Sequence, residues 1–201
     1  MPSLTRIVNN PFFNIAFFFA VRQAIKYFGL EKPEYLMGFR ILYYGVQILV
    51  VLLSFYIISI INTKNDQTVL RYVDPAKPGW DGVETQDTLV VTTFAGKSLI
   101  EYDKQEVFKA MKQSAMGIAM VSFLHFKFGY IQPLVIQSLL GIKAFFTTKE
   151  ARIHLFHEST KSGDLKRPFS VQAPLGMNQM FPQPKTDKAS IKKAERALKA
   201  D

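Results

Sequence analysis

The chain has 201 residues, 48% of them hydrophobic, and its 25 Lys and Arg outnumber 16 Asp and Glu, which gives a formal net charge of +9 at pH 7. It contains no cysteine, and this excludes disulfides, thiolate metal sites and cysteine nucleophiles. The apolar runs lie in the first three-quarters of the chain, whereas residues 147–201 are polar and basic. This segregation indicates a membrane domain followed by a charged segment.

The first apolar segment, residues 12–30, begins in the run PFFNIAFFFAV. A signal peptide carries its basic residues before the apolar run, but here Arg22 and Lys26 follow it, with no clear cleavage site, so we interpret the segment as retained. Arg22 and Lys26 are four residues apart and share one helix face. The segment is therefore either a span whose cationic face meets protein or a wet groove, or an interfacial amphipathic helix.

The strongest membrane signal is FRILYYGVQILVVLLSFYIISII, residues 39–61. No charged residue occurs from Ile41 to Ile61. A helix of that length measures about 30 Å, the hydrocarbon thickness of a bilayer. Arg40 and Lys64 flank the run, where long cationic side chains reach the interface. We predict a membrane span here.

Residues 62–110 have the character of a soluble loop. TVLRYV and DTLVVTTF are typical of short strands, and KSLIEY is a candidate for a third. Asp103 with Glu106 three residues later resembles a capping box, so we expect a helix that starts near Lys104 and runs toward the membrane.

Two further apolar segments, residues 114–128 and 131–146, are separated by a break at Gly129-Tyr130. Each is short for a bilayer, and together they are too long for one simple span. They form either a hairpin of two short spans or one span followed by an amphipathic surface segment. Gly129 and Pro133 flank the expected turn.

The distribution of basic residues favours the hairpin. Lys and Arg are frequent in the 62–110 loop and in the 147–201 tail, while the tip GYIQP has none. By the positive-inside rule, the loop and the tail are cytosolic, and the linker at residues 31–38 and the tip lie on the other side. We therefore expect four spans, or three spans with an N-terminal surface helix.

The predicted fold is an all-α membrane protein with about four transmembrane helices, the last two forming a short hairpin. A small cytosolic loop holds short strands, and a basic cytosolic tail follows. The predicted domains are a membrane domain, residues 1–146, and the tail, residues 147–201.

His125 lies inside an apolar stretch, where ionisable side chains are functional candidates because facing lipid is costly. Ser122 is three residues earlier, on the same helix side. The alternative is that His125 only donates a hydrogen bond to a neighbouring helix. We predict a polar groove in the membrane, lined by Arg22, Lys26, Ser122, His125 and Gln137.

The basic tail is expected to end in a helix capped by Asp187, with cations around most of its circumference. Such a surface suits the ribosome, through ribosomal RNA, or lipid headgroups, although a merely solvated helix explains it equally well. The candidate contact residues are Lys166, Arg167, Lys188, Lys192 and Lys193. No nucleotide-binding, metalloprotease or serine-hydrolase motif is present, so we expect no enzyme, no cofactor and no metal site.

Several segments carry a family resemblance. They are NDQTVLRYVDP (65–75), GIAMVSFLHFKFGYIQPLVIQS (117–138), IHLF (153–156), SGDLKRPF (162–169) and PKTDKASIKKAERA (184–197). In this order they resemble the SRP-independent targeting component three family, also known as the fungal inorganic-phosphate-transport protein eighty-eight family.

The resemblance implies a protein of the endoplasmic reticulum membrane. It implies partners as well: the Sec translocon, other SRP-independent targeting components, and client membrane and secretory proteins. The order of span, cytosolic loop and two-span hairpin is similar, as fold-level analogy only, to the core of Oxa-type insertases. The rival hypotheses are a phosphate or ion transporter and a structural membrane adaptor.

Overall fold

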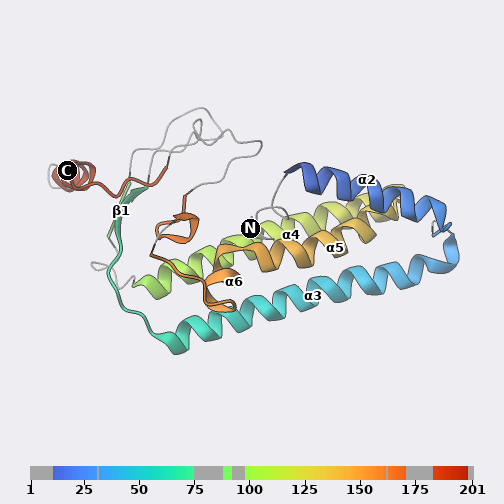
Figure 1. The fold of residues 1–201 in the computed structure, drawn as a ribbon, viewed down its shortest axis with the longest axis horizontal. Coiled ribbons are helices and arrows are strands. Elements are labelled where there is room, and N and C mark those ends of the chain that lie inside the picture. The colour runs from blue at the N-terminus through green and yellow to red at the C-terminus, as the bar shows by residue number, and fades with distance from the viewer. Residues whose placement is uncertain are drawn as a thin grey trace. The chain divides into compact units, whose positions relative to one another are not determined.

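The structure is a computed structural model, and it describes residues 11–30, 32–74, 88–91, 98–161, 163–170 and 183–198. These residues are mostly helical, as predicted (Figure 1). They form two compact units, each made of two chain segments: unit 1 is residues 1–60 and 105–156, and unit 2 is residues 61–104 and 157–201. In this grouping the central loop belongs with most of the tail. The division into a membrane domain, residues 1–146, and a tail, residues 147–201, remains a prediction.

Unit 1 is built from helices, coloured blue to orange in Figure 1. Helix α2 packs against α5, and α5 packs against α6. The bounds are α2 Pro11–Tyr27, α3 Pro33–Lys64, α4 Leu99–Phe128, α5 Gln132–Thr147 and α6 Lys149–His154.

Helix α3 contains the strongest predicted span. Among the described residues it is the one helix that is long and apolar enough to cross a membrane. Its buried residues recur at alternating spacings of four and three, which is the heptad pattern of a helix packed along one seam. These residues are Tyr43, Gln47, Val50, Ser54, Ile57 and Ile61, and Val46 is buried beside them. The seam faces protein, and large apolar side chains such as Ile48 and Leu52 are exposed.

The predicted turn at Gly129 is confirmed. Helix α4 ends at Phe128, and Gly129 has a positive φ, a left-handed conformation that favours glycine. The Gly129 amide donates to the His125 carbonyl at 2.9 Å. Pro133 lies in the first turn of α5, where a missing amide proton costs no helical hydrogen bond.

The other end of α4 corrects two expectations. The helix begins at Leu99 rather than near Lys104, so Asp103 lies inside it and does not cap it. The candidate strand KSLIEY is helical from Leu99 onward. Leu99, Tyr102 and Val107 are all buried, and their spacing of three and five places them on one side of a helix.

Unit 2 contains an antiparallel pair of strands, β1 (Arg71–Asp74) and β2 (Thr88–Val91), which overlap the two predicted strand runs. On the other edge of β1, Val73 exchanges two backbone hydrogen bonds with Lys185. Helix α7 (Lys188–Leu198) packs against both strands, and a short 3₁₀ helix, η1, covers Gly163–Leu165. The core of the unit consists of Val73, Leu99, Tyr102, Leu165 and Phe169.

Helices therefore occupy each of the four predicted spans. Three of them do not meet the length and hydropathy criteria for a span that α3 meets. Helix α2 has 17 residues and α5 is shorter by one. At a helical rise of about 1.5 Å per residue, each is shorter than the ~30 Å of a bilayer core. The four-span topology and the cytosolic side of the tail remain predictions.

Candidate functional site

A buried polar contact of unit 1 joins α3 to α4. Arg40 Nε donates to His125 Nε2 at 3.0 Å, and the His125 side chain is only 3% exposed. The other ring nitrogen, Nδ1, lies 2.9 Å from the Tyr130 carbonyl oxygen. Because Nε2 accepts from Arg40, the proton must sit on Nδ1, and this defines a neutral tautomer that donates to Tyr130. His125 thus links α3 to the hairpin turn.

One helical turn further along α3, Tyr44 and Ser122 form a second bridge between the same helices. Their hydroxyl oxygens are 3.0 Å apart. Ser122 and His125, three residues apart on α4, both use partners on α3. The prediction that they share one side of α4 is confirmed.

Two glutamines approach glycines on neighbouring helices. Gln137 Nε2 of α5 lies 3.9 Å from the place of a Cβ on Gly117 of α4. Gln47 Nε2 of α3 lies 3.5 Å from the corresponding place on Gly141 of α5. At both distances a Cβ would be in ordinary van der Waals contact with the amide. Polar side chains from three helices therefore meet within unit 1.

Arg22 and Lys26 lie elsewhere on the surface of unit 1. Both are exposed on α2, and Ile25 between them is buried. Among the described residues, no hydrogen bond or ion pair joins Arg22 or Lys26 to Ser122, His125 or Gln137. The structure thus brings Ser122 and His125 together and sets Gln137 against the same helix, and their groove with Arg22 and Lys26 stays a prediction.

Sequence reasoning missed Arg40, Tyr44 and Gln47. Because Arg40 lies at the end of an apolar run, the sequence predicted that its side chain reaches the membrane interface. The signal for a buried role was its heptad spacing. Arg40 precedes Tyr44 by four and Gln47 by seven residues, on the side of α3 that carries the buried seam.

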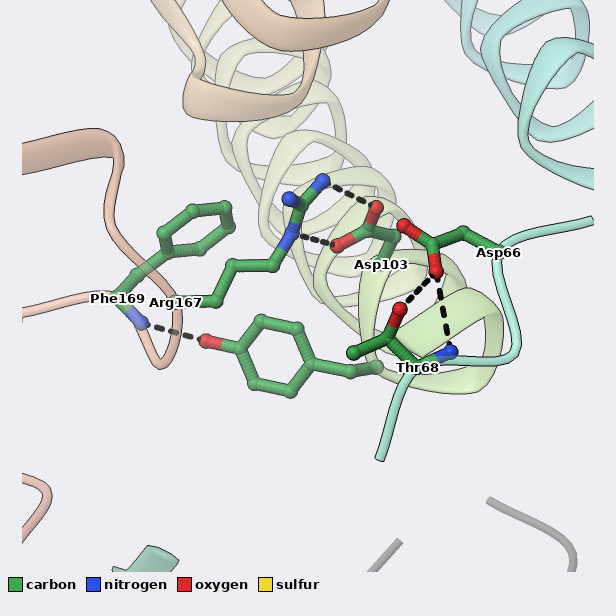
Figure 2. A network of polar contacts seen from close by, with 6 residues as sticks. Asp66, Thr68, Asp103, Arg167 and Phe169 are labelled. Atoms are coloured by element: carbon green, nitrogen blue, oxygen red, sulfur yellow. Dashed lines mark hydrogen bonds and ion pairs between the residues drawn. The ribbon is translucent and has the colours of Figure 1, made fainter. Parts of the chain in front are cut away.

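In unit 2, a buried ion pair fastens the tail to the first turns of α4 (Figure 2). Arg167 donates from Nε and Nη2 to both carboxylate oxygens of Asp103, each at 2.6 Å. The side chains are 11% and 5% exposed. This two-point geometry is the strongest form of an arginine–carboxylate contact.

The residues around this ion pair complete the packing. The Phe169 amide donates to the Tyr102 hydroxyl at 2.7 Å, and the Tyr102 ring contacts those of Tyr72 and Phe169. In the turn before β1, Asp66 accepts from the amide and the hydroxyl of Thr68. These hydrogen bonds lower the pKa of Asp66 below its ordinary value.

This geometry corrects the expectation for Arg167. The sequence predicted a surface contact to the ribosome or lipid, but Arg167 is largely buried and bound to Asp103. A partner 64 residues away in sequence leaves no local signal. Lys166, the neighbouring candidate, is exposed and lines a cleft of unit 2 with Arg167, Ser170 and Thr186.

Helix α7 presents a basic face to solvent. The predicted cap is confirmed, since Asp187 accepts from the Ser190 amide at 2.7 Å, and this contact lowers the pKa of Asp187. Four exposed cations share less than half of the helix circumference, opposite Ile191 and Ala194. They are Lys188, Lys192, Lys193 and Arg196. The cations are therefore gathered on one side of the helix rather than spread around it.

The chain matches a known protein family. The family described as "Phosphate transport (Pho88)" matches residues 8–201. The chain belongs to the Pho88 family. It is 35% identical over 190 residues to SRP-independent targeting protein 3 of Saccharomyces cerevisiae, covering 92% of this chain and 93% of that protein. It is 34% identical over 165 residues to the SRP-independent targeting protein 3 homolog of Schizosaccharomyces pombe, covering 82% of this chain and 80% of that protein. No solved structure gives a significant match.

The family assignment agrees with the resemblance seen in the sequence. Among the described residues of this Pho88-family chain, no group of three or more histidine or acidic side chains is placed to hold a metal ion. In unit 1 the polar groups form hydrogen-bonded bridges between helices. In unit 2 they form the Arg167–Asp103 ion pair and, separately, the basic face of α7.

Proposed function

We propose that this protein takes part in SRP-independent targeting of membrane and secretory proteins to the endoplasmic reticulum, and that it helps insert them. The observation that carries the proposal is the similarity over most of the chain to two proteins named for SRP-independent targeting. The Sec translocon and other SRP-independent targeting components are its proposed partners.

The polar side chains of unit 1 support a physical mechanism. Arg40, Ser122, His125 and Gln137 place hydrogen-bonding groups inside an otherwise apolar bundle. If this side of the bundle admits water, it lowers the cost of moving a polar segment of a client past the hydrocarbon. The mechanism breaks no covalent bond, so the proposed role is non-enzymatic.

A matched pair of substitutions tests this mechanism. Gln137→Leu removes a polar group that faces α4, and Gln113→Leu makes the same change at an exposed position of α4. We expect Gln137→Leu to reduce insertion of an SRP-independent client several-fold in cells, with Gln113→Leu close to wild type. Equal insertion by both variants, at equal protein levels, would remove the support for a functional groove.

The basic face of α7 is proposed to contact the ribosome or the lipid surface on the cytosolic side. Lys192 and Lys193 are exposed there, whereas Lys64 and Lys161 are exposed elsewhere in unit 2. Lys192→Gln with Lys193→Gln should weaken binding to ribosomes or to anionic vesicles and reduce its salt dependence. Lys64→Gln with Lys161→Gln is the control of equal charge. If only the control variant lost binding, the contact would have to involve Lys64 or Lys161 rather than α7.

The proposed topology has four spans and can be mapped by glycosylation. Acceptor sites would be placed near the N-terminus, at residues 34, 80 and 130, with a lengthened tip, and in the tail. Modification near 34 and 130 but not at 80 or in the tail supports four spans. Modification at 80 or in the tail contradicts the hairpin topology and the groove with it.

Phosphate transport is a second candidate, which the description of the matching family favours. Purified protein in liposomes distinguishes the two. Phosphate flux above that of empty vesicles would support transport, and its absence together with normal client insertion would support targeting.

A further inference from the structure

Tyr43 stands out among the polar side chains of unit 1. Its side chain is completely buried, at 0% exposure, and its hydroxyl has no hydrogen-bond partner among the described residues. Other buried hydroxyls of the bundle are satisfied by their own helix, since Ser54 donates to the Val50 carbonyl and Ser138 donates to the Leu134 carbonyl. An unpaired buried hydroxyl is costly and rare.

Two glutamines, on α3 and α5, carry further polar groups in the same bundle as Tyr43. Gln47 lies one turn further along the same side of α3 and points at Gly141 of α5. Gln137 of α5 points at Gly117 of α4. We call Tyr43, Gln47 and Gln137, with the two glycines, the polar layer.

Helix α4 is exposed on all sides over part of its length, next to Gly117 of this layer. Residues 112–116 are exposed in succession, which is more than one helical turn, so no face of α4 is covered there. Side-chain hydrogen bonds join α4 to α3 at Arg40–His125 and Tyr44–Ser122, and both lie toward the hairpin turn. A displacement confined to the segment around residues 112–116 leaves both of them in place, and also the Arg167–Asp103 ion pair near the start of α4.

We propose that the polar layer is a binding site for one hydrogen-bond-accepting group carried by an otherwise apolar transmembrane segment, and that it opens by displacement of α4. The acceptor receives the Tyr43 hydroxyl proton in a hydrogen bond, and the amides of Gln47 and Gln137 complete the contact. This inference rests on the proposed function and identifies which part of a client the bundle recognises.

The charge beside the layer favours an acceptor over a cation, because Arg40, one turn before Tyr43, is positively charged. The Tyr43 hydroxyl and the two amides can each donate a hydrogen bond to such an acceptor, although they can also accept one. An amide or hydroxyl side chain in a client span fits these groups. In the closed bundle the Tyr43 hydroxyl has neither a partner among the described residues nor contact with solvent, so binding satisfies a group that folding leaves unpaired.

The test uses the purified full-length protein in lipid nanodiscs and two synthetic single-span peptides. Both are leucine–alanine helices with lysine ends, one with a central glutamine and one with leucine at that position. We expect wild-type protein to bind the glutamine peptide about fivefold more tightly, as for one additional hydrogen bond. Tyr43→Phe should abolish this preference, so that the variant binds the two peptides with equal affinity.

Thermal unfolding of the same variants tests independently whether the Tyr43 hydroxyl lacks a partner. Tyr43→Phe should leave the midpoint of unfolding unchanged or raise it, because it removes a hydroxyl without a partner. Tyr44→Phe is the matched control: it loses the bridge to Ser122 and should lower the midpoint while keeping the preference for the glutamine peptide. Gln47→Met, with similar volume, tests the layer a second time if Tyr43→Phe does not fold.

Equal binding of the two peptides by wild type would overturn the inference, as would an unchanged preference in Tyr43→Phe. A lowered midpoint in Tyr43→Phe would show that the hydroxyl has a structural partner, which also overturns it. These outcomes are distinct from failure of the proposed function, which would appear as normal client insertion in cells that lack the protein.

Discussion

The two units differ in how their buried polar groups are paired. In unit 2, Arg167 and Asp103 are opposite charges that satisfy each other at two points. In unit 1, the cation Arg40 has a neutral buried partner, His125, and the Tyr43 hydroxyl has none among the described residues. The first arrangement holds a fold together. The second leaves hydrogen-bonding capacity inside the bundle, as expected of a region that works on other molecules.

The largest effect should come from breaking the ion pair of unit 2. Arg167→Met leaves the Asp103 carboxylate buried without its cation, which costs about 3–5 kcal/mol. Hydrogen exchange at the Val73 and Lys185 amides, which form the bridge at β1, measures the loss.

The control for that experiment is Arg71→Met, in the same unit. Arg71 and Glu195 are about half exposed and 3.9 Å apart, so their pair is worth about 0–1 kcal/mol. Replacing the buried pair together, with Asp103→Leu and Arg167→Met, should restore most of the stability because no charge stays buried alone. Similar losses from Arg167→Met and Arg71→Met would show that the ion pair does not fasten the tail.

A smaller effect is expected from the neutral bridge of unit 1. A double-mutant cycle of Tyr44→Phe and Ser122→Ala should give a coupling free energy of about 0.6 kcal/mol, typical of hydrogen bonds between membrane helices. Unfolding of the protein in mild detergent provides the four values. A coupling free energy of zero would mean that the two hydroxyls do not hold α3 to α4. The contrast between the stabilising ion pair of unit 2 and the polar groups of unit 1 would then be larger.

The smallest effect is expected on the loss of helix at acidic pH. The pKa of Asp187 is lowered by the amide and hydroxyl of Ser190, so its contribution is fully present above the ordinary value of 3.8 and is lost as the pH falls below it. Asp187→Asn keeps a capping oxygen without a charge. Circular dichroism should therefore show less acid-induced loss of helix in Asp187→Asn than in wild type between about pH 4 and 2. An identical profile would exclude Asp187 as a source of acid sensitivity.

Local sequence signals predicted the local features well. Gly129 followed by Pro133 indicated the hairpin turn, and Asp187 indicated the start of α7, because each acts on backbone a few residues away. The contacts that define the candidate sites join distant residues. Arg40 and His125 are 85 residues apart, and Asp103 and Arg167 are 64 apart.

Tertiary packing also overrode two local patterns. KSLIEY has residues that suit a strand, yet it begins α4 because Leu99 and Tyr102 are buried together in unit 2. Asp103 resembled a cap, and its carboxylate is instead held by Arg167. In both cases the deciding partner comes from another part of the chain.

The central claim is that unit 1 carries a polar groove in the membrane, and thiol accessibility tests it most directly because the chain has no native cysteine. Single cysteines at 122, 125 and 137 would be compared with controls at the exposed apolar positions 48 and 52 of α3 and with a loop control at 69. The account predicts that the first three react with a water-soluble thiol reagent in membranes, as the loop control does, while 48 and 52 do not. Groove cysteines as unreactive as those at 48 and 52, with a reactive loop control, would contradict it.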